Sequence, residues 1–169
     1  RLLKQPAVTI QSYVCRPQSR GKIRLHSKDF YEPPKILSNL IGERDDMLRL
    51  ISSLKTIVKI FKSDPFSKYF KNLIRPKNNL RSDEEIEEFI RKHAEGAYHP
   101  VGTCRMGNDS LSVVDSNLRV RGVNALRIAD ASIMPIIPSG NTNAPSMMVG
   151  EKASDLILNS ERVWNEKLL

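Results

Sequence analysis

The feature that most restricts how this chain can fold is a stripe of apolar side chains within residues 43–63. Its members recur at steps of three and four residues, and they are Met47, Leu50, Ile51, Leu54, Ile57, Val58 and Phe61. Such spacing puts all of them on one face of an α-helix and leaves the lysines between them on the other face. The stripe therefore predicts a long amphipathic helix whose apolar face must be covered by other parts of the chain.

A second helix is predicted over residues 82–96. Ser82 is followed three residues later by Glu85, which is the spacing of a capping box at a helix N-terminus. Acidic residues cluster in the first turn and basic residues in the last, as the helix dipole favours. We expect Gly96 to end this helix.

Alternation of apolar and polar residues predicts β-structure elsewhere in the chain. Residues 7–17 are rich in β-branched types, and residues 22–27 alternate again after a Q-S-R-G turn, so we expect an antiparallel pair. Residues 30–39 contain two adjacent prolines, which favour an extended chain over a helix. Residues 113–130 are expected to form two short strands around an R-G-V-N turn, the second of them buried.

Composition excludes some classes of protein. Of the 169 residues, 40% are hydrophobic and 27% charged, which is typical of a globular chain rather than a disordered one. No apolar run is long enough to span a bilayer. The net charge of +8 requires that a nucleic-acid partner be considered. However, the basic residues are scattered along the chain, and aromatic residues make up only 6%. We therefore expect the basic side chains to lie on a solvated surface and not to bind nucleic acid.

The stretch Y-H-P-V-G-T-C-R-M-G at residues 98–107 is the first candidate for chemistry. A metal site is not expected, because three histidines and two cysteines lie far apart and lack the compact spacing of zinc ligands. Cys104 follows His99 by five residues, but no orienting group or oxyanion hole for a cysteine nucleophile is recognisable. Cys15 and Cys104 could pair with each other or with cysteines outside this sequence, and buried thiols are the default interpretation. A single catalytic histidine remains the third alternative.

The residues around a second loop favour that third alternative. Asn141 and Asn143 lie in S-G-N-T-N-A-P-S, at the start of a helix predicted over 146–160 with Pro145 near its first turn. Asn143 could simply cap this helix, and Asp130 could simply start a turn. Asp130 and Ala131 end the predicted buried strand, where small residues let a backbone approach a phosphate-bearing cofactor. Together these parts are suited to proton removal beside a nucleotide cofactor.

Four blocks of the sequence, in this order, resemble the C-terminal part of the glucose-methanol-choline (GMC) family of flavin-dependent oxidoreductases. The blocks are S-R-G-K-I-R-L-H-S, Y-H-P-V-G-T-C-R-M-G, residues 113–135 and S-G-N-T-N-A-P-S-M-M-V-G-E-K-A-S-D-L-I, and the resemblance covers about residues 7–158. The G-N-T-N-A-P form looks most like insect FAD-dependent (quinone) glucose dehydrogenases or their choline-dehydrogenase-like relatives.

The resemblance implies an α+β fragment made of parts of two domains. Residues 1–97 would be the C-terminal part of a substrate-binding domain with an antiparallel sheet. Residues 98–169 would supply the active-site loop together with the C-terminal strands and helix of an FAD-binding, Rossmann-like domain. His99 falls on the family's catalytic histidine and Asn141 on its second active-site position. Asp130 and Ala131 fall near the FAD pyrophosphate, and Asn143 near the flavin ring.

The function implied by the resemblance is the FAD-dependent oxidation of an alcohol or sugar hydroxyl. His99 would be the general base, and the electrons would pass on to a quinone or to oxygen. Insect relatives suggest an extracellular location. No G-x-G-x-x-G fingerprint occurs in this sequence, and it begins at Arg1, so we expect a fragment that is inactive alone. The alternatives are an inactive relic of the flavoenzyme fold and a basic, non-catalytic binding module.

Overall fold

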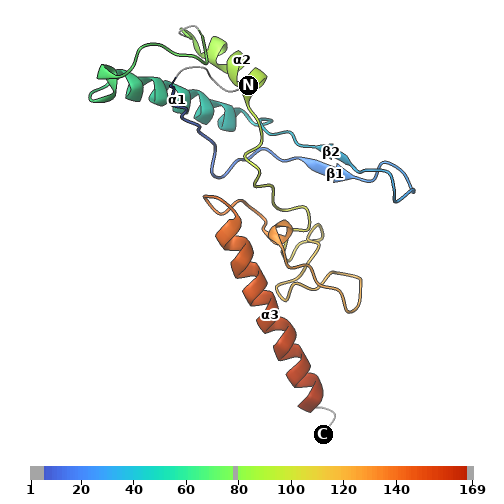
Figure 1. Cartoon of the computed structure of the whole chain (residues 1–169). Helices are drawn as coiled ribbons and strands as arrows, with labels where there is room; N and C mark the ends of the chain where they lie inside the picture. The colour runs from blue at the N-terminus through green and yellow to red at the C-terminus, as the bar shows by residue number, and fades with distance from the viewer. Residues whose placement is uncertain (1–5, 78–79, 167–169) are drawn as a thin grey trace. The chain divides into compact units, whose positions relative to one another are not determined.

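The structure is a computed structural model that describes residues 6–77 and 80–166. Its elements in chain order are β1 (Lys22–Arg24), β2 (Lys35–Leu37), α1 (Arg44–Lys62), the 3₁₀ helix η1 (Phe66–Lys68), α2 (Asp83–His93), the 3₁₀ helix η2 (Ala131–Ile133) and α3 (Asn143–Glu166) (Figure 1). The chain divides into two compact units. One contains the chain up to Gly21 together with Ser38–Ala97, and the other contains Lys22–Leu37 and the chain from Tyr98 onward.

Helices α1 and α2 form the core of the first unit, as the apolar stripe predicted (Figure 1). Met47 and Ile51 of α1 are buried against Ile86 and Ile90 of α2. All four apolar side chains are removed from water, which is the main source of stability for two amphipathic helices. The prediction of both helices is therefore confirmed.

The ends of α2 differ from the prediction in two details. The Ser82 hydroxyl accepts a hydrogen bond from the Glu85 amide at 3.3 Å, as expected of an N-cap. The Glu85 carboxylate, however, accepts from the Arg81 amide at 2.6 Å, so the capping box is not closed reciprocally. The helix ends at His93 and the extended residue Ala94 follows, so Gly96 does not supply a left-handed cap.

A buried carboxylate joins the loop before β1 to the start of α1. Asp46 is 1% exposed, and it accepts hydrogen bonds from the Gln18 amide at 3.0 Å and the Ser19 amide at 2.7 Å. The Ser19 hydroxyl also donates to Asp46, at 2.6 Å, and accepts from the amides of Gly42 and Glu43. Glu43 precedes α1 without capping it through its own side chain. Ser19 therefore satisfies the helix N-terminus from a distant part of the sequence.

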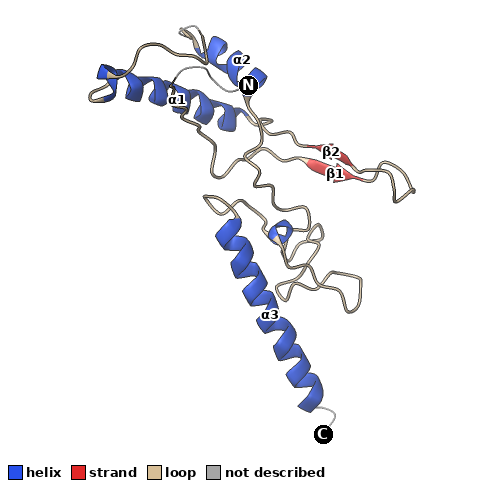
Figure 2. Cartoon of the chain, in the orientation of Figure 1, coloured by secondary structure: helices blue, strands red, loops and turns tan. Residues whose placement is uncertain are grey.

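The antiparallel pair in the structure is not the pair that the sequence predicted. β1 pairs with β2, with Ile23 opposite Ile36, and Figure 2 shows the two strands as arrows side by side. Residues 7–17 contain no strand, and Val8 is 72% exposed. Alternation fixes which side chains would share a face, but a strand also needs a hydrogen-bonded neighbour. The extended segment around Pro33 and Pro34 provides that neighbour to β1, whereas residues 7–17 do not.

The second unit has its own apolar core around the first half of α3. Val149 and Ala153 of this helix are buried together with Val114, Leu118, Ile133 and Met134. The predicted strands in residues 113–130 are reduced to single antiparallel bridges, Val114 with Val120 and Arg119 with Arg127. Leu126 is 47% exposed, so the prediction of a buried strand there is wrong for this structure. A buried strand needs neighbours on both faces, and the described residues do not provide them.

Candidate active site

His99 lies half-buried in the second unit and contacts the residue that precedes α3. Its Nδ1 atom is 3.0 Å from the hydroxyl oxygen of Thr142 and 3.5 Å from the Thr142 amide nitrogen. Thr142 is only 8% exposed. Within residues 6–77 and 80–166, Nε2 of His99 has no hydrogen-bond partner. The ring is therefore held through one nitrogen and leaves the other available.

Backbone contacts fix the loop that carries His99. The Cys104 amide donates to the Ser132 carbonyl at 3.0 Å, and the Met106 amide donates to the Ile133 carbonyl at 2.7 Å. Tyr98, just before His99, has a φ of 62°. This left-handed conformation is uncommon outside glycine and is found mainly where the surroundings impose it. The histidine thus sits on a loop tied to η2 and its flanking residues.

Gly102 allows this loop to approach the segment after η2. Its φ is +87°, and an added Cβ would lie 3.2 Å from the Met134 carbonyl oxygen. Gly122 has a similar φ of +75°, but an added Cβ there would meet nothing within 4 Å. The two glycines therefore separate the effect of backbone conformation from that of close approach.

We expect Gly102→Ala to destabilise the protein by about 1–2 kcal/mol from left-handed strain alone, with a further loss because the Met134 carbonyl oxygen, 3.2 Å from the added Cβ, would have to shift. Gly122→Ala is the matched control, because it carries the strain without this close contact. Chemical denaturation of the two variants measures the difference in free energy of unfolding. Equal stability of the two would contradict the role of close packing at Gly102.

The two predicted asparagines flank Thr142 at the start of α3. Asn143 is the first residue of the helix, and Thr142 takes the capping position, because its carbonyl accepts from the Ser146 amide at 2.9 Å. The N-cap of α3 is therefore Thr142, one residue before the predicted Asn143. Asn141 and Asn143 are both exposed. Thr142, which contacts His99, is therefore the residue between the two predicted asparagines.

Asp130 and Ala131 lie at the start of η2. The Asp130 carboxylate accepts a hydrogen bond from the Ser132 amide at 2.7 Å and caps this short helix. The side chain and the backbone amide of Ser132 hold the pKa of Asp130 below its usual range. Ala131 is half-buried against the core of the second unit. Asp130 therefore starts a turn, which was the simpler of its two interpretations. Among the described residues, no hydrogen bond joins Asp130 to His99.

The other sequence candidates contribute less to the site. Cys15 and Cys104 are both free thiols, Cys15 exposed and Cys104 half-buried, so they do not pair with each other and Cys15 is not buried. No hydrogen bond joins Cys104 to His99 in the described part of the chain. No cluster of three or more metal-ligating side chains is found among residues 6–77 and 80–166. None of the helices that the structure describes is both long and apolar enough to cross a membrane.

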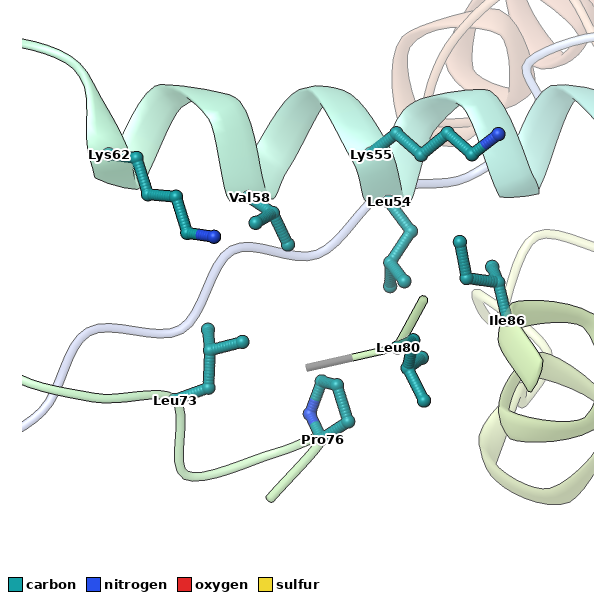
Figure 3. Close-up of a pocket in the computed structure, with 8 residues that line it drawn as sticks. All are labelled: Leu54, Lys55, Val58, Lys62, Leu73, Pro76, Leu80 and Ile86. Carbon is teal, nitrogen blue, oxygen red and sulfur yellow. The ribbon is translucent and has the colours of Figure 1, made fainter. Parts of the chain in front are cut away.

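A small hollow in the first unit is not suited to a cofactor. Figure 3 shows it between α1, α2 and the segment that joins them, and its volume is about 90 Å³. Apolar side chains line it together with Lys55 and Lys62. Ligand pockets are typically several times larger, about 300–1,000 Å³. We therefore place the candidate site at His99 and not in this hollow.

Thr142 is the site residue that the sequence did not reveal. Its position between two candidate amides, just before a predicted helix, was the available signal. A threonine there is ordinarily a helix cap, and the contact with a ring 43 residues away depends on tertiary structure.

Known proteins are similar to this chain in both sequence and fold. The family profile described as GMC oxidoreductase matches residues 17–150. The alcohol dehydrogenase (acceptor) of Pseudomonas putida is 45% identical over 142 residues, which are 84% of this chain and 26% of that protein. The oxygen-dependent choline dehydrogenase of Chromohalobacter salexigens is 42% identical over 146 residues, 86% of this chain and 26% of that protein.

Two solved structures extend the comparison to the fold. Pyridoxine 4-oxidase from Mesorbium loti matches with a TM-score of 0.76 and 30% identity, over 83% of this chain and 28% of that one. An FAD-dependent oxidoreductase from Chaetomium thermophilum matches with a TM-score of 0.82 and 27% identity, over 88% of this chain and 26% of that one. The chain spans about a quarter of the length of the curated relatives it matches. With a family match across most of its length, this chain belongs to the GMC oxidoreductase family.

Proposed function

We propose that this chain carries the proton-accepting part of an active site that oxidises a CH–OH group with FAD. The observation that carries the proposal is the state of His99: its Nδ1 is held by Thr142, and its Nε2 has no partner in the described part of the chain. A half-buried imidazole with one free nitrogen is suited to general base catalysis near neutral pH.

The residues of the second unit are compatible with bound FAD. The 24-residue helix α3 begins beside Asn141 and Asn143, and both are exposed. The positive end of a helix dipole stabilises an electron-rich group. This supports the proposal that Asn143, at the start of α3, lies near the flavin ring. Asp130 and Ala131 remain the proposed contacts of the pyrophosphate. The G-x-G-x-x-G fingerprint is absent from this sequence, so the proposal concerns the protein together with the polypeptide that supplies such a unit.

The proposed reaction divides the substrate's two hydrogens between the protein and the cofactor. FAD, when bound, supplies the two-electron acceptor for the hydride that leaves the carbinol carbon. Nε2 of His99 takes the hydroxyl proton. The amide N–H of Asn141 donates to the substrate oxygen and stabilises the charge that develops there. The products are a carbonyl compound and a protonated His99.

The names of the relatives support a proposal for the substrate class. Choline and alcohol dehydrogenases are 42% and 45% identical to this chain, which favours a primary alcohol, choline-like or aliphatic. The resemblance to insect FAD-dependent glucose dehydrogenases adds a sugar hydroxyl as a candidate, with oxygen or a quinone as final acceptor. An extracellular location stays a prediction from the same resemblance.

The test is anaerobic flavin reduction by the protein expressed from its whole reading frame. Choline, short primary alcohols and glucose are added in turn, and loss of the oxidised flavin absorbance is recorded. We expect at least one of the three classes to bleach the flavin. A protein that binds no flavin, but binds nucleic acid with a steep salt dependence, would instead support a basic binding module.

A further inference from the structure

We propose that Thr142 is a positioning residue that fixes which nitrogen of His99 carries the proton. This inference rests on the proposed function, because it explains how His99 becomes able to act as a base. Two groups of Thr142 face Nδ1: the hydroxyl oxygen at 3.0 Å and the amide nitrogen at 3.5 Å. Only the hydroxyl of these two groups is able to accept a hydrogen bond from a protonated Nδ1.

The amide can only donate, whereas the hydroxyl can donate or accept. A neutral ring with its proton on Nδ1 needs an acceptor at Nδ1, and the hydroxyl is the acceptor found there. If only the amide faced Nδ1, the proton would be driven to Nε2. A neutral ring protonated on Nε2 cannot take a second proton at that atom. The Thr142 hydroxyl is therefore what makes the base-competent tautomer available.

The lengths of the two contacts favour the hydroxyl. A distance of 3.0 Å is ordinary for a hydrogen bond, whereas 3.5 Å is beyond the usual range for an amide donor. The amide contact is thus weak, and the hydroxyl partner dominates. In the proposed arrangement, Nδ1–H donates to the Thr142 oxygen, and the lone pair of Nε2 is left for the substrate.

Both partners are held firmly enough for such a contact to persist. The Thr142 carbonyl accepts from the Ser146 amide at 2.9 Å and from the Ser146 hydroxyl at 2.6 Å, which anchors Thr142 to the first turn of α3. Val149, in the second turn of α3, is buried in the core of the second unit. The His99 loop is tied to Ser132 and Ile133 through its backbone. A base oriented by a third group is a recurrent arrangement in enzymes.

The tautomer can be read directly by nitrogen NMR of protein labelled with ¹⁵N-histidine, expressed from the whole reading frame. At alkaline pH, where the imidazole is neutral, protonated and unprotonated ring nitrogens have well-separated shifts. We expect the Nδ1–H form in the wild type and in Thr142→Ser, and the Nε2–H form in Thr142→Val. The same tautomer in the wild type and in Thr142→Val would overturn the proposal.

Flavin reduction gives the second measurement. We expect Thr142→Val to lower the reduction rate at least about tenfold, as part of the 10²–10⁴ that a general base supplies. The apparent substrate affinity should change little, and Thr142→Ser should restore the rate. Ser146→Ala is the matched control, because it removes a hydrogen bond to the Thr142 carbonyl without touching the ring. A loss of rate as large in Ser146→Ala would indicate a merely structural role for Thr142.

The two proposals fail in different ways. If His99→Ala leaves flavin reduction unchanged, the proposed function is wrong, and the nitrogen spectra still decide the tautomer. If His99→Ala abolishes reduction but Thr142→Val alters neither the tautomer nor the rate, only the role of Thr142 is overturned.

Discussion

Replacing His99 by alanine is expected to slow flavin reduction by about 10²–10⁴-fold, the contribution typical of a general base. The physical reason is that the hydroxyl proton then has no acceptor as the hydride leaves carbon. FAD should stay bound, because the His99 side chain makes its hydrogen bonds to Thr142 within the second unit. Stopped-flow absorbance of the complete protein measures the reduction rate, and the visible spectrum measures the flavin content.

His93→Ala is the matched control for this experiment. His93 ends α2, is exposed, and has its Nδ1 atom 2.9 Å from the Phe89 carbonyl oxygen. No part of the proposed chemistry uses it, so the rate should stay close to that of the wild type. A near-normal rate in His99→Ala would remove His99 from the catalytic role.

Replacing Asp46 by alanine is expected to destabilise the first unit by about 3 kcal/mol, the upper part of the range for unpaired buried groups. The change leaves two backbone amides, those of Gln18 and Ser19, without their acceptor. It also frees the Ser19 hydroxyl that satisfies the start of α1. Hydrogen exchange reports this locally: protection of the Gln18 and Ser19 amides should fall by about 10²-fold.

The neighbouring Asp45 provides the control within the same turn of α1. Its carboxylate is 58% exposed and pairs with Arg49 at 2.8 Å. Exposed pairs of this kind contribute about 0–1 kcal/mol, so Asp45→Ala should leave the two amides protected. An equal loss of protection in both variants would show that Asp46 has no special structural role.

The pH dependence of the same protection follows from the state of Asp46. Burial by itself would raise the pKa of this carboxyl, but the Ser19 hydroxyl and the amides of Gln18 and Ser19 outweigh it, and the pKa is lowered. A lowered pKa means that the stabilisation is fully present above the unfolded value near 3.9. It is then lost as pH falls through the lower folded value. Asp46→Ala should abolish this acid-dependent loss.

Local patterns predicted the helices of this protein well. The stripe from Met47 to Phe61 gave α1, and the charge pattern after Ser82 gave α2, because helical periodicity and capping depend on residues three or four apart. The helix after Asn141 was also expected, although α3 extends to Glu166. The strands were predicted less well, because β1 found its partner in the proline-containing segment and not in residues 7–17.

The sequence by itself determined the family, the helices and the position of His99 and Asn141 in two polar loops, since these depend on local spacing and on the order of four motifs. Only the tertiary structure decided which group faces the His99 ring. Thr142 lies 43 residues from His99, and their contact depends on the loop tied to Ser132 and Ile133 and on the packing of α3 in the same core. Such a contact is set by the fold as a whole, and no spacing within either loop encodes it.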